Sequence, residues 1–263
     1  MERDMLFREV KNMGRDYFSF ADIFTPIESA KQVLAKGAAI LQGPIAGTLL
    51  VSKKSVDLII ASEIGDEKRY NLKDKFPTLP GGASGITIGI GYDLGQGVDS
   101  VEEFVSDWTG IIDNTSIERL KVAVRANHER AKQLLPSLKN IVIPLDAAKQ
   151  VFYKKTLPKY AKTTIRAFPN VEYLYPDAQG AMLSLIYNRG ASMKGDRRKE
   201  MLMLKQLIPT KNYVGMARSI RSMKRLWADD KNLRGLLIRR ENEAKFVENA
   251  NRAYSYDELI RLY

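Results

Sequence analysis

Three side chains near the glycine-rich stretch GITIGIGYDLG (residues 85–95) could carry acid–base chemistry. Thr87 and Asp93 lie inside the stretch, and Glu63 precedes it. In an inverting glycosidase, one carboxylic acid protonates the leaving oxygen while a second carboxylate positions water on the opposite side of the sugar. A hydroxyl can help to hold that water. This chemistry would require the two carboxyl groups to lie about 6.5–9.5 Å apart.

Glu63 falls in a segment whose pattern predicts a helix over about residues 55–62, with Ser55 as its N-cap. Val56, Ile59 and Glu63 have the spacing of one helical face, so the carboxyl takes a place where an apolar side chain would be expected. Removal from water and the negative end of the helix dipole both favour the protonated form that a general acid needs. The same pattern also fits a glutamate that ends an amphipathic helix at a wet boundary.

The stretch that carries Thr87 and Asp93 alternates like a β-strand, with large apolar side chains at every second position. A straight strand would hold these two residues about 20 Å apart at ~3.3 Å per residue, too far to share one reacting centre. A turn at Gly89 and Gly91 would form a hairpin and return Asp93 to Thr87. The glycines would leave bare backbone that a flat ligand can approach. A hairpin with a solvated aspartate is the alternative.

A dinucleotide-binding loop is a poorer interpretation of the same stretch. That fingerprint needs glycine at its first, third and sixth positions after a buried parallel strand. Gly89 and Gly91 satisfy the first two of these positions, but Leu94 occupies the sixth.

Composition limits the other chemistries. A chain of 263 residues that is 44% hydrophobic can form a packed core, and the lack of cysteine excludes disulfides and thiolate catalysis. The only histidine, His128, lies in a charged run and cannot by itself build a zinc cluster or a serine triad. We therefore expect His128 to be an ordinary boundary residue, and we expect no metal and no cofactor.

The remaining pattern predicts an α+β protein that is predominantly helical. We expect a helical segment of unknown role over residues 1–52, with a helix ending at Gly37, and one domain over residues 53–263. A loop is expected from Gly65 to Gly85, strand signal is confined to residues near 85–95, and helices follow almost to the end.

The net charge of +11 favours an anionic partner, such as nucleic acid, a membrane surface or a cell-wall polymer. Lysines and arginines alternate with acids along the chain, which is also typical of a solvated helical surface. The uncharged run over residues 37–51 is interrupted by Pro44 and is shorter than the ~20 residues of a membrane span. The acidic amino-terminal residues are not typical of a secretory signal peptide.

Three blocks of this sequence, in order, resemble the phage-type lysozyme superfamily, and most closely its pesticin-like muramidase domains. The first block runs from ASEIG to TIGIGYDLG, the second is DAQGAMLSLIYNRG, and the third runs from MKRLW to LLIRRENEA. Together they cover roughly residues 55–250. Relatives commonly have an aromatic residue before PGG, whereas this chain has Leu79.

The resemblance implies a lysozyme-like fold with a small β-hairpin lobe and a larger helical lobe. It implies that Glu63 is the general acid, that Thr87 helps to position water, and that Asp93 is the second carboxylate. In shorter phage lysozymes the second carboxylate precedes the threonine, which makes rivals of three residues: Asp66, Glu67 and Asp74. The matched blocks also contain Tyr92 and Asn188, which could line a sugar cleft with Gly89 and Gly91, or could serve packing and capping.

The activity implied by the resemblance is hydrolysis of the β-1,4 bond between N-acetylmuramic acid and N-acetylglucosamine in peptidoglycan. The alternative is a non-catalytic wall-binding or virion structural protein with the same fold. Such an enzyme would be made in the cytoplasm and act on the periplasm or wall as a phage endolysin or an antibacterial effector. Its expected partners are peptidoglycan and a holin, secretion apparatus or immunity protein. We expect no nucleic acid partner and no stable membrane span.

Overall fold

The computed structural model describes residues 44–230 and 233–263. Its α-helices are α4 (Lys53–Ile64), α5 (Glu67–Arg69), α6 (Val101–Trp108), α7 (Asn114–Leu120), α8 (His128–Leu138), α9 (Leu145–Val151), α10 (Leu157–Ala167), α11 (Pro176–Arg189), α12 (Lys199–Leu207), α13 (Tyr213–Ser222) and α14 (Arg234–Glu248). Its strands are β1 (Leu49–Ser52), β2 (Thr87–Ile88), β3 (Tyr92–Asp93) and β4 (Leu259–Leu262). Short π turns are η2 (Tyr70–Asp74) and η4 (Phe152–Thr156), and short 3-10 turns are η3 (Lys121–Ala123), η5 (Val171–Tyr173), η6 (Asp196–Arg198), η7 (Met223–Leu226) and η9 (Tyr256–Glu258).

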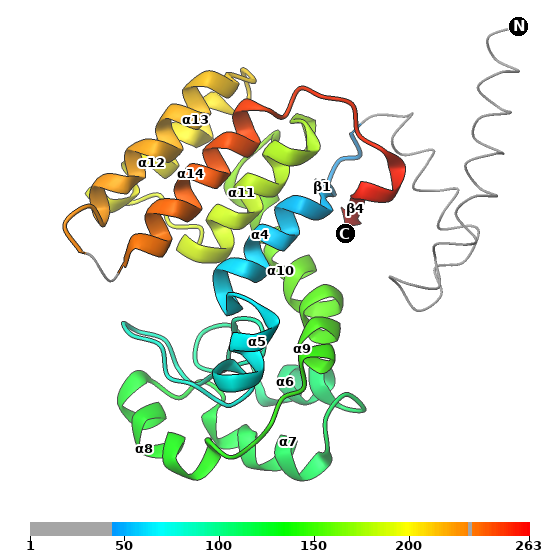
Figure 1. Ribbon diagram of the computed structural model, residues 1–263, viewed down its shortest axis with the longest axis vertical. Helices are drawn as coiled ribbons and strands as arrows, with labels where there is room; N and C mark the ends of the chain where they lie inside the picture. Colours follow the sequence, from blue (N-terminus) through cyan, green and yellow to red (C-terminus); the bar gives the residue numbers. More distant parts are fainter. Residues whose placement is uncertain (1–43, 231–232) are drawn as a thin grey trace, which may run out of the picture.

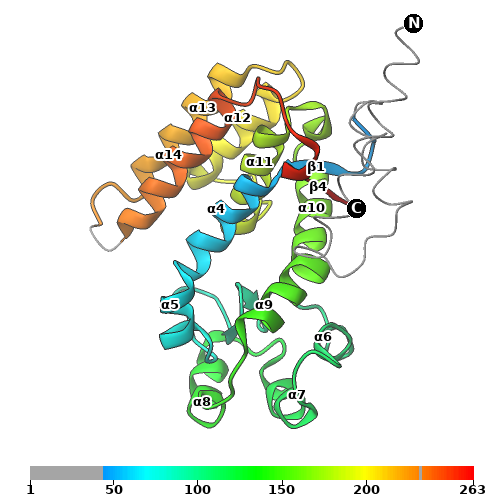
Figure 2. The same cartoon turned by 45° about the vertical axis from the view of Figure 1, so that its right-hand side comes forward.

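These elements form two lobes, one above the other in Figure 1. The upper lobe contains α11 to α14, and the lower lobe contains α5 to α8 together with the β2–β3 hairpin (Figures 1 and 2). The chain descends between the lobes through α4 and returns through α9 and α10. The predicted α+β class with predominant helix is confirmed, although the lower lobe is itself mostly helical.

Helix α11 forms the centre of the upper lobe. Every residue from Asp177 to Tyr187 is buried, as expected for a helix that other elements cover on all sides. A Cβ atom at Gly180 would lie 1.9 Å from the Oγ of Ser55, so glycine lets α4 approach α11 closely. This contact fixes the start of α4, the helix that carries Glu63.

The first and last strands form a second sheet that the sequence did not predict. Strand β1 pairs antiparallel with β4, with Leu49 opposite Leu262 and Ser52 opposite Leu259. Gln179 of α11 supports this pair, because its Oε1 accepts a 2.8 Å hydrogen bond from the N–H of Leu50. The prediction that strands occur only near residues 85–95 is therefore wrong. Each strand has only four residues, and its partner lies at the other end of the chain, so no local pattern marks it.

Two local predictions around α4 also need correction. The helix begins at Lys53, and its N-cap is Ser52, whose Oγ accepts a hydrogen bond from the N–H of Ser55. The segment after Gly65 is not all loop, because α5 and η2 continue helical structure as far as Asp74. Tyr70 stabilises this turn: it is buried, and its hydroxyl donates to the carbonyl of Ile143 at 2.9 Å.

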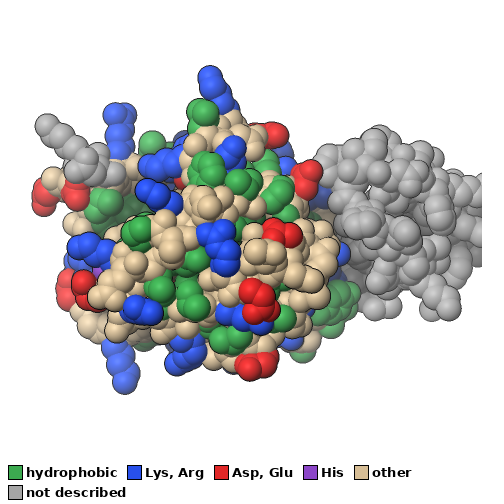
Figure 3. All heavy atoms as spheres, turned by 90° about the horizontal axis from the view of Figure 1, so that it is seen from below, with side chains coloured by type: hydrophobic (Ala, Val, Ile, Leu, Met, Phe, Trp, Pro, Cys, Tyr) green, Lys and Arg blue, Asp and Glu red, His purple; other side chains and the backbone are tan. Residues whose placement is uncertain are grey.

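The described residues begin inside the expected amino-terminal segment, and the predicted helix before Gly37 lies outside them. Within residues 44–230 and 233–263, no helix has both the length and the apolar character required to cross a bilayer. Figure 3 views the molecule from the lower-lobe end and shows Lys and Arg side chains interspersed with Asp and Glu. On this face the positive charge is spread out.

Candidate active site

The glycine-rich stretch folds into the predicted hairpin. Strands β2 and β3 pair antiparallel, and Thr87 is directly opposite Asp93 in the register. Residues that face each other across an antiparallel pair project to the same side of the sheet. Gly89 and Gly91 form the turn with φ values of +58° and +65°, a region that glycine enters without steric penalty. The hairpin therefore brings the hydroxyl of Thr87 and the carboxyl of Asp93 together.

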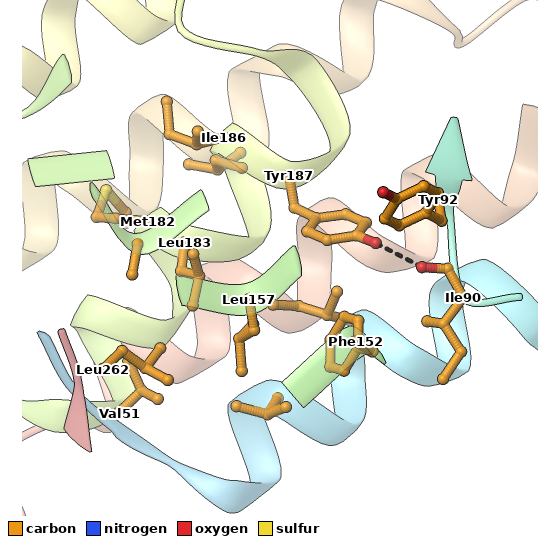
Figure 4. Packing of buried hydrophobic residues seen from close by; sticks show 14 of the residues in the cluster. Val51, Ile90, Tyr92, Phe152, Leu157, Met182, Leu183, Ile186, Tyr187 and Leu262 are labelled. Atoms are coloured by element: carbon orange, nitrogen blue, oxygen red, sulfur yellow. Dashed lines mark hydrogen bonds between the residues drawn. The ribbon is translucent and has the colours of Figure 1, made fainter. Parts of the chain in front are cut away.

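The glycines of the turn also pack closely against helices. A Cβ atom at Gly91 would lie 2.7 Å from the hydroxyl oxygen of Tyr187, and one at Gly89 would lie 3.1 Å from the Cβ of Ala148. The Tyr187 hydroxyl donates to the carbonyl of Ile90 between them at 2.8 Å (Figure 4). Gly89 and Gly91 thus seat the turn on α9 and α11, and Gly91 also lines a pocket beside the hairpin.

Backbone donors of its own loop hold the Asp93 carboxyl. Its Oδ1 accepts hydrogen bonds from the N–H groups of Gly85 at 3.1 Å, Gly95 at 2.7 Å and Gln96 at 3.2 Å. No described residue donates a hydrogen bond to Oδ2. One oxygen therefore fixes the side chain, and the other is available to accept a proton or hydrogen bond from a water molecule.

Glu63 lies in the last turn of α4, and Val56 and Ile59 on the same helix are buried as predicted. Its carboxyl is not, however, surrounded only by apolar groups. The Nη1 atom of Arg239 donates to Oε1 of Glu63 at 2.8 Å, and the two side chains are 3% and 25% exposed respectively. This partner is supplied by α14, far along the chain, and fixes the orientation of a carboxyl that solvent can still reach.

Arg239 belongs to a buried charged cluster formed by α11 and α14. Its Nε and Nη2 atoms donate to the hydroxyl and carbonyl oxygens of Ser184, each at 3.2 Å. Glu243 accepts a 2.6 Å hydrogen bond from the Ser184 hydroxyl, and its carboxylate lies between Arg239 and Arg240. The spacing of these three charges in RRENE was a visible signal, because i, i+3 and i, i+4 pairs share a helix face. Nothing in that spacing indicated contact with Glu63.

The charge of Glu63 affects two tyrosines near the hairpin, Tyr160 and Tyr187. Tyr160 and Tyr187 pack with ring centroids 4.4 Å apart. Burial raises the pKa of Tyr160, and the negative charges of Glu63 and Asp93 raise it further. Burial also raises the pKa of Tyr187, with the charge of Glu63 as the next cause. The negative charges of both carboxyl groups thus favour the neutral form of one phenol, that of Tyr160.

A pocket of about 340 Å³ opens beside the hairpin, and its walls include Asp93, Tyr160, Lys155 and Lys159. Lys155 is paired with Asp107 at 3.2 Å, and Lys159 is paired with Glu103 at 2.8 Å. Glu63 is not part of this wall. The pocket offers Asp93 and several cations to a polar or anionic ligand.

Tyr92 and Asn188, the two side chains expected to line a sugar cleft, lie in different places. Tyr92 is 6% exposed, its hydroxyl donates to Asp107 Oδ2 at 2.9 Å, and its ring packs edge-on against Trp108. Burial, followed by the charge of Asp107, raises the pKa of this phenol. Asn188 is exposed and lines a separate pocket beyond the end of α11. Tyr92 thus packs in the core and also lines the pocket that contains Asp93, whereas Asn188 does not line that pocket.

Two of the three rival carboxylates, those of Asp66 and Asp74, have local partners. Asp66 caps α5 by accepting a hydrogen bond from the N–H of Arg69, and Glu67 is exposed in the first turn of that helix. Asp74 lies 3.4 Å from the Arg69 guanidinium. Asp93 differs from all three, because its charge acts together with that of Glu63 on Tyr160.

Two further sequence features have structural roles. Nδ1 of His128, at the start of α8, lies 2.9 Å from the carbonyl oxygen of Ser84, and Leu79 packs against the hydrophobic core. Among residues 44–230 and 233–263, no group of three or more His, Asp or Glu side chains is arranged to hold a metal ion.

No protein-family model matches the chain, and no curated protein sequence matches it either. Any functional assignment must therefore be argued from the site itself and from the three sequence blocks.

Proposed function

We propose that this protein is a peptidoglycan hydrolase of the muramidase type, similar to pesticin-like members of the phage-type lysozyme superfamily. It cleaves the β-1,4 bond between N-acetylmuramic acid and N-acetylglucosamine. The observation that carries the proposal is the hairpin register, which pairs Thr87 with Asp93 on a hairpin packed against Tyr187, a phenol whose pKa the charge of Glu63 raises.

In the proposed reaction, Glu63 protonates the glycosidic oxygen as the bond to the sugar breaks. Arg239 touches the same carboxyl and keeps it pointed at the leaving group. Asp93 accepts a proton from the attacking water through the oxygen that its loop does not occupy, and Thr87 supplies a second contact to that water. Attack from the face opposite the leaving group inverts the anomeric centre.

The charge of the chain supports the choice of substrate. Peptidoglycan and the polymers around it are polyanionic, and a net charge of +11 increases the rate at which the protein meets them. In this proposal the protein reaches the periplasm or wall through lysis, a holin or a secretion apparatus, as an endolysin or an antibacterial effector. The reaction is the same in both settings.

Clearing of purified peptidoglycan by the full chain tests the proposal. We expect Glu63→Gln and Asp93→Asn each to slow clearing by about 10²–10⁴-fold, the usual contribution of a general acid or base. Both changes keep the size of the side chain, and the amide introduced by Asp93→Asn would still offer an oxygen to the three backbone donors. Glu129→Gln on α8 is the matched control, and Asp74→Asn tests the strongest rival. Clearing at the wild-type rate by both site variants would refute the site.

The products distinguish the bond that is cut. A muramidase releases new reducing ends, and an inverting one yields the α-configured sugar first. New free amines without reducing ends would identify an amidase instead. A β-configured first product would leave the muramidase intact but overturn the direct displacement.

One observation favours the non-catalytic alternative. Three backbone N–H groups on one oxygen of Asp93 are what a purely structural aspartate would also receive. In that case the wild-type protein would sediment with peptidoglycan and release no reducing ends, and Asp93→Asn would lower its stability without affecting wall binding.

A further inference from the structure

A second pocket, of about 460 Å³, lies past the end of α11 and is separate from the one beside Asp93. Four cationic side chains contribute to its wall: Arg189, Lys194, Arg197 and Arg198. The remaining wall residues are neutral: Asn188, Trp227 and Leu236. None of the described residues that line this pocket is acidic.

The two acidic residues of the neighbouring segment, Asp196 and Glu200, are paired with cations outside the pocket. Asp196 accepts a hydrogen bond from Nη1 of Arg225 at 2.9 Å and also pairs with Lys199. Glu200 accepts from Nε of Arg225 at 2.6 Å. Within the described part of the chain, none of the four pocket cations has a carboxylate within ion-pair distance. Four positive charges therefore share one small space, and Glu200 acts on Arg189 only from beyond ion-pair distance.

Arg189 is the buried member of this group. Its side chain is 8% exposed and lies over the Trp227 ring, with the guanidinium carbon 5.0 Å from the ring centroid. One guanidinium nitrogen donates to the carbonyl of Arg197, while its buried Nε has no hydrogen-bond partner among the described residues. Burial of a cation with an unused donor is costly, and an anion in the pocket would offset part of that cost through its charge.

The electrostatics point the same way. Burial, together with the positive charges of Arg198 and Arg240, lowers the pKa of Arg189 to about 10, although the charge of Glu200 opposes this shift. Burial also lowers the pKa of Arg198, with Arg197 as the second cause. A bound anion would relieve both the desolvation and the mutual repulsion.

We propose that this pocket binds a phosphate group carried by an anionic envelope polymer, of the poly(glycerol phosphate) kind. Three guanidinium groups and one ammonium group offer donors from several directions, which suits the oxygens of a phosphate better than the two oxygens of a carboxylate. A nucleic acid partner would favour cations spaced along a groove that follows its backbone, whereas these four line one pocket. The choice of an envelope polymer rests on the proposed function, but the phosphate site itself uses none of the residues of the hydrolase site.

Titration of the full chain with inorganic phosphate at constant ionic strength tests the pocket. We expect saturable binding, tighter than that of acetate. The double variant Arg197→Gln/Arg198→Gln should bind phosphate roughly tenfold or more weakly, because it loses charge-assisted hydrogen bonds. Replacing both arginines by lysine should restore part of the affinity. Arg130→Gln/Lys132→Gln on α8, which removes the same charge at exposed positions, should bind like the wild type.

A second titration with poly(glycerol phosphate) and with duplex oligonucleotide of equal charge identifies the source of the phosphate. Tighter binding of the polymer supports the proposal, and tighter binding of the duplex overturns it. Acetate bound as tightly as phosphate, or phosphate binding that the double glutamine variant retains, also overturns it. If that variant fails to fold, the single change Lys194→Gln at an exposed position must weaken phosphate binding. Glu63→Gln should bind phosphate normally, so failure of the hydrolase proposal remains distinguishable.

Discussion

The two carboxyl groups of the candidate site are held in opposite ways. Asp93 is fixed by neutral N–H groups of its own loop, all within eight residues of it. Glu63 is fixed by Arg239, which lies 176 residues away and is itself held by Ser184 and Glu243. The hairpin lobe positions its carboxyl by local backbone geometry, and the helical lobe does so through a buried ionic cluster.

This difference has an energetic consequence. Neutral hydrogen bonds to a partly exposed carboxylate can be replaced by water at modest cost when one of them is lost. Charges buried between helices have no such replacement, because each depends on its partner to offset the loss of solvation. We therefore expect the two lobes to respond very differently to single substitutions.

The largest effect on stability is expected for Glu243→Gln. The change leaves Arg239 and Arg240 buried without the carboxylate that lies between them, and losing one partner of a buried pair costs about 3–5 kcal/mol. Denaturant unfolding measures this loss in the free energy of unfolding. Glu241→Gln, the same substitution on the partly exposed side of α14, is the control and should cost much less. Equal losses would mean that burial does not distinguish the two glutamates.

The hairpin could be predicted from the sequence because its signals are local. Alternating isoleucines, glycines at the turn and the distance limit between Thr87 and Asp93 all lie within one short stretch. The helix that carries Glu63 was predicted for the same reason, although its cap at Ser52 was missed because Ser55 offered an equally good side chain.

The other half of the site could not be predicted. The contact between Glu63 and Arg239 depends on how α4, α11 and α14 cross, which no periodicity within one helix determines. The β1–β4 pair was missed for a related reason, since its partners are at opposite ends of the domain. The packing of Gly91 against Tyr187 could not be predicted either, because it is a tertiary contact.

Gly91→Ala tests how tightly the hairpin is seated on α11. Alanine would meet strain at a φ of +65° and would also place its Cβ 2.7 Å from the Tyr187 hydroxyl. Gly110→Ala is the matched control, because its φ is +76° and no atom lies within 4 Å of its Cβ. Strain alone costs about 1 kcal/mol, and we expect the clash at Gly91 to add about 1–3 kcal/mol of lost stability.

A double-mutant cycle separates the clash from the strain. Tyr187→Phe removes the oxygen that alanine would meet, so the cost of Gly91→Ala should be smaller in the Tyr187→Phe background. Additive effects would show that the hairpin shifts away from α11 freely, and that the close contact does not fix the position of Asp93.

The smallest effect on the free energy of unfolding is expected from the partly exposed ion pairs that Glu241 of α14 makes, and this effect depends on pH. Hydrogen bonds from Arg221 and then Lys224 lower the pKa of Glu241 from 4.5 to about 2. Because the folded pKa lies below the unfolded one, this stabilisation is fully present above pH 4.5 and is lost as pH falls towards 2. Glu241→Gln should therefore reduce the change in the free energy of unfolding across that pH window by about 0.2–1 kcal/mol, since solvent screens the pair.

High salt should reduce the difference between the wild type and Glu241→Gln further, whereas the cost of Glu243→Gln should change little. We would abandon the distinction between a buried ionic face of α14 at Glu243 and a solvated face at Glu241 if both substitutions cost the same free energy of unfolding and salt changed neither cost.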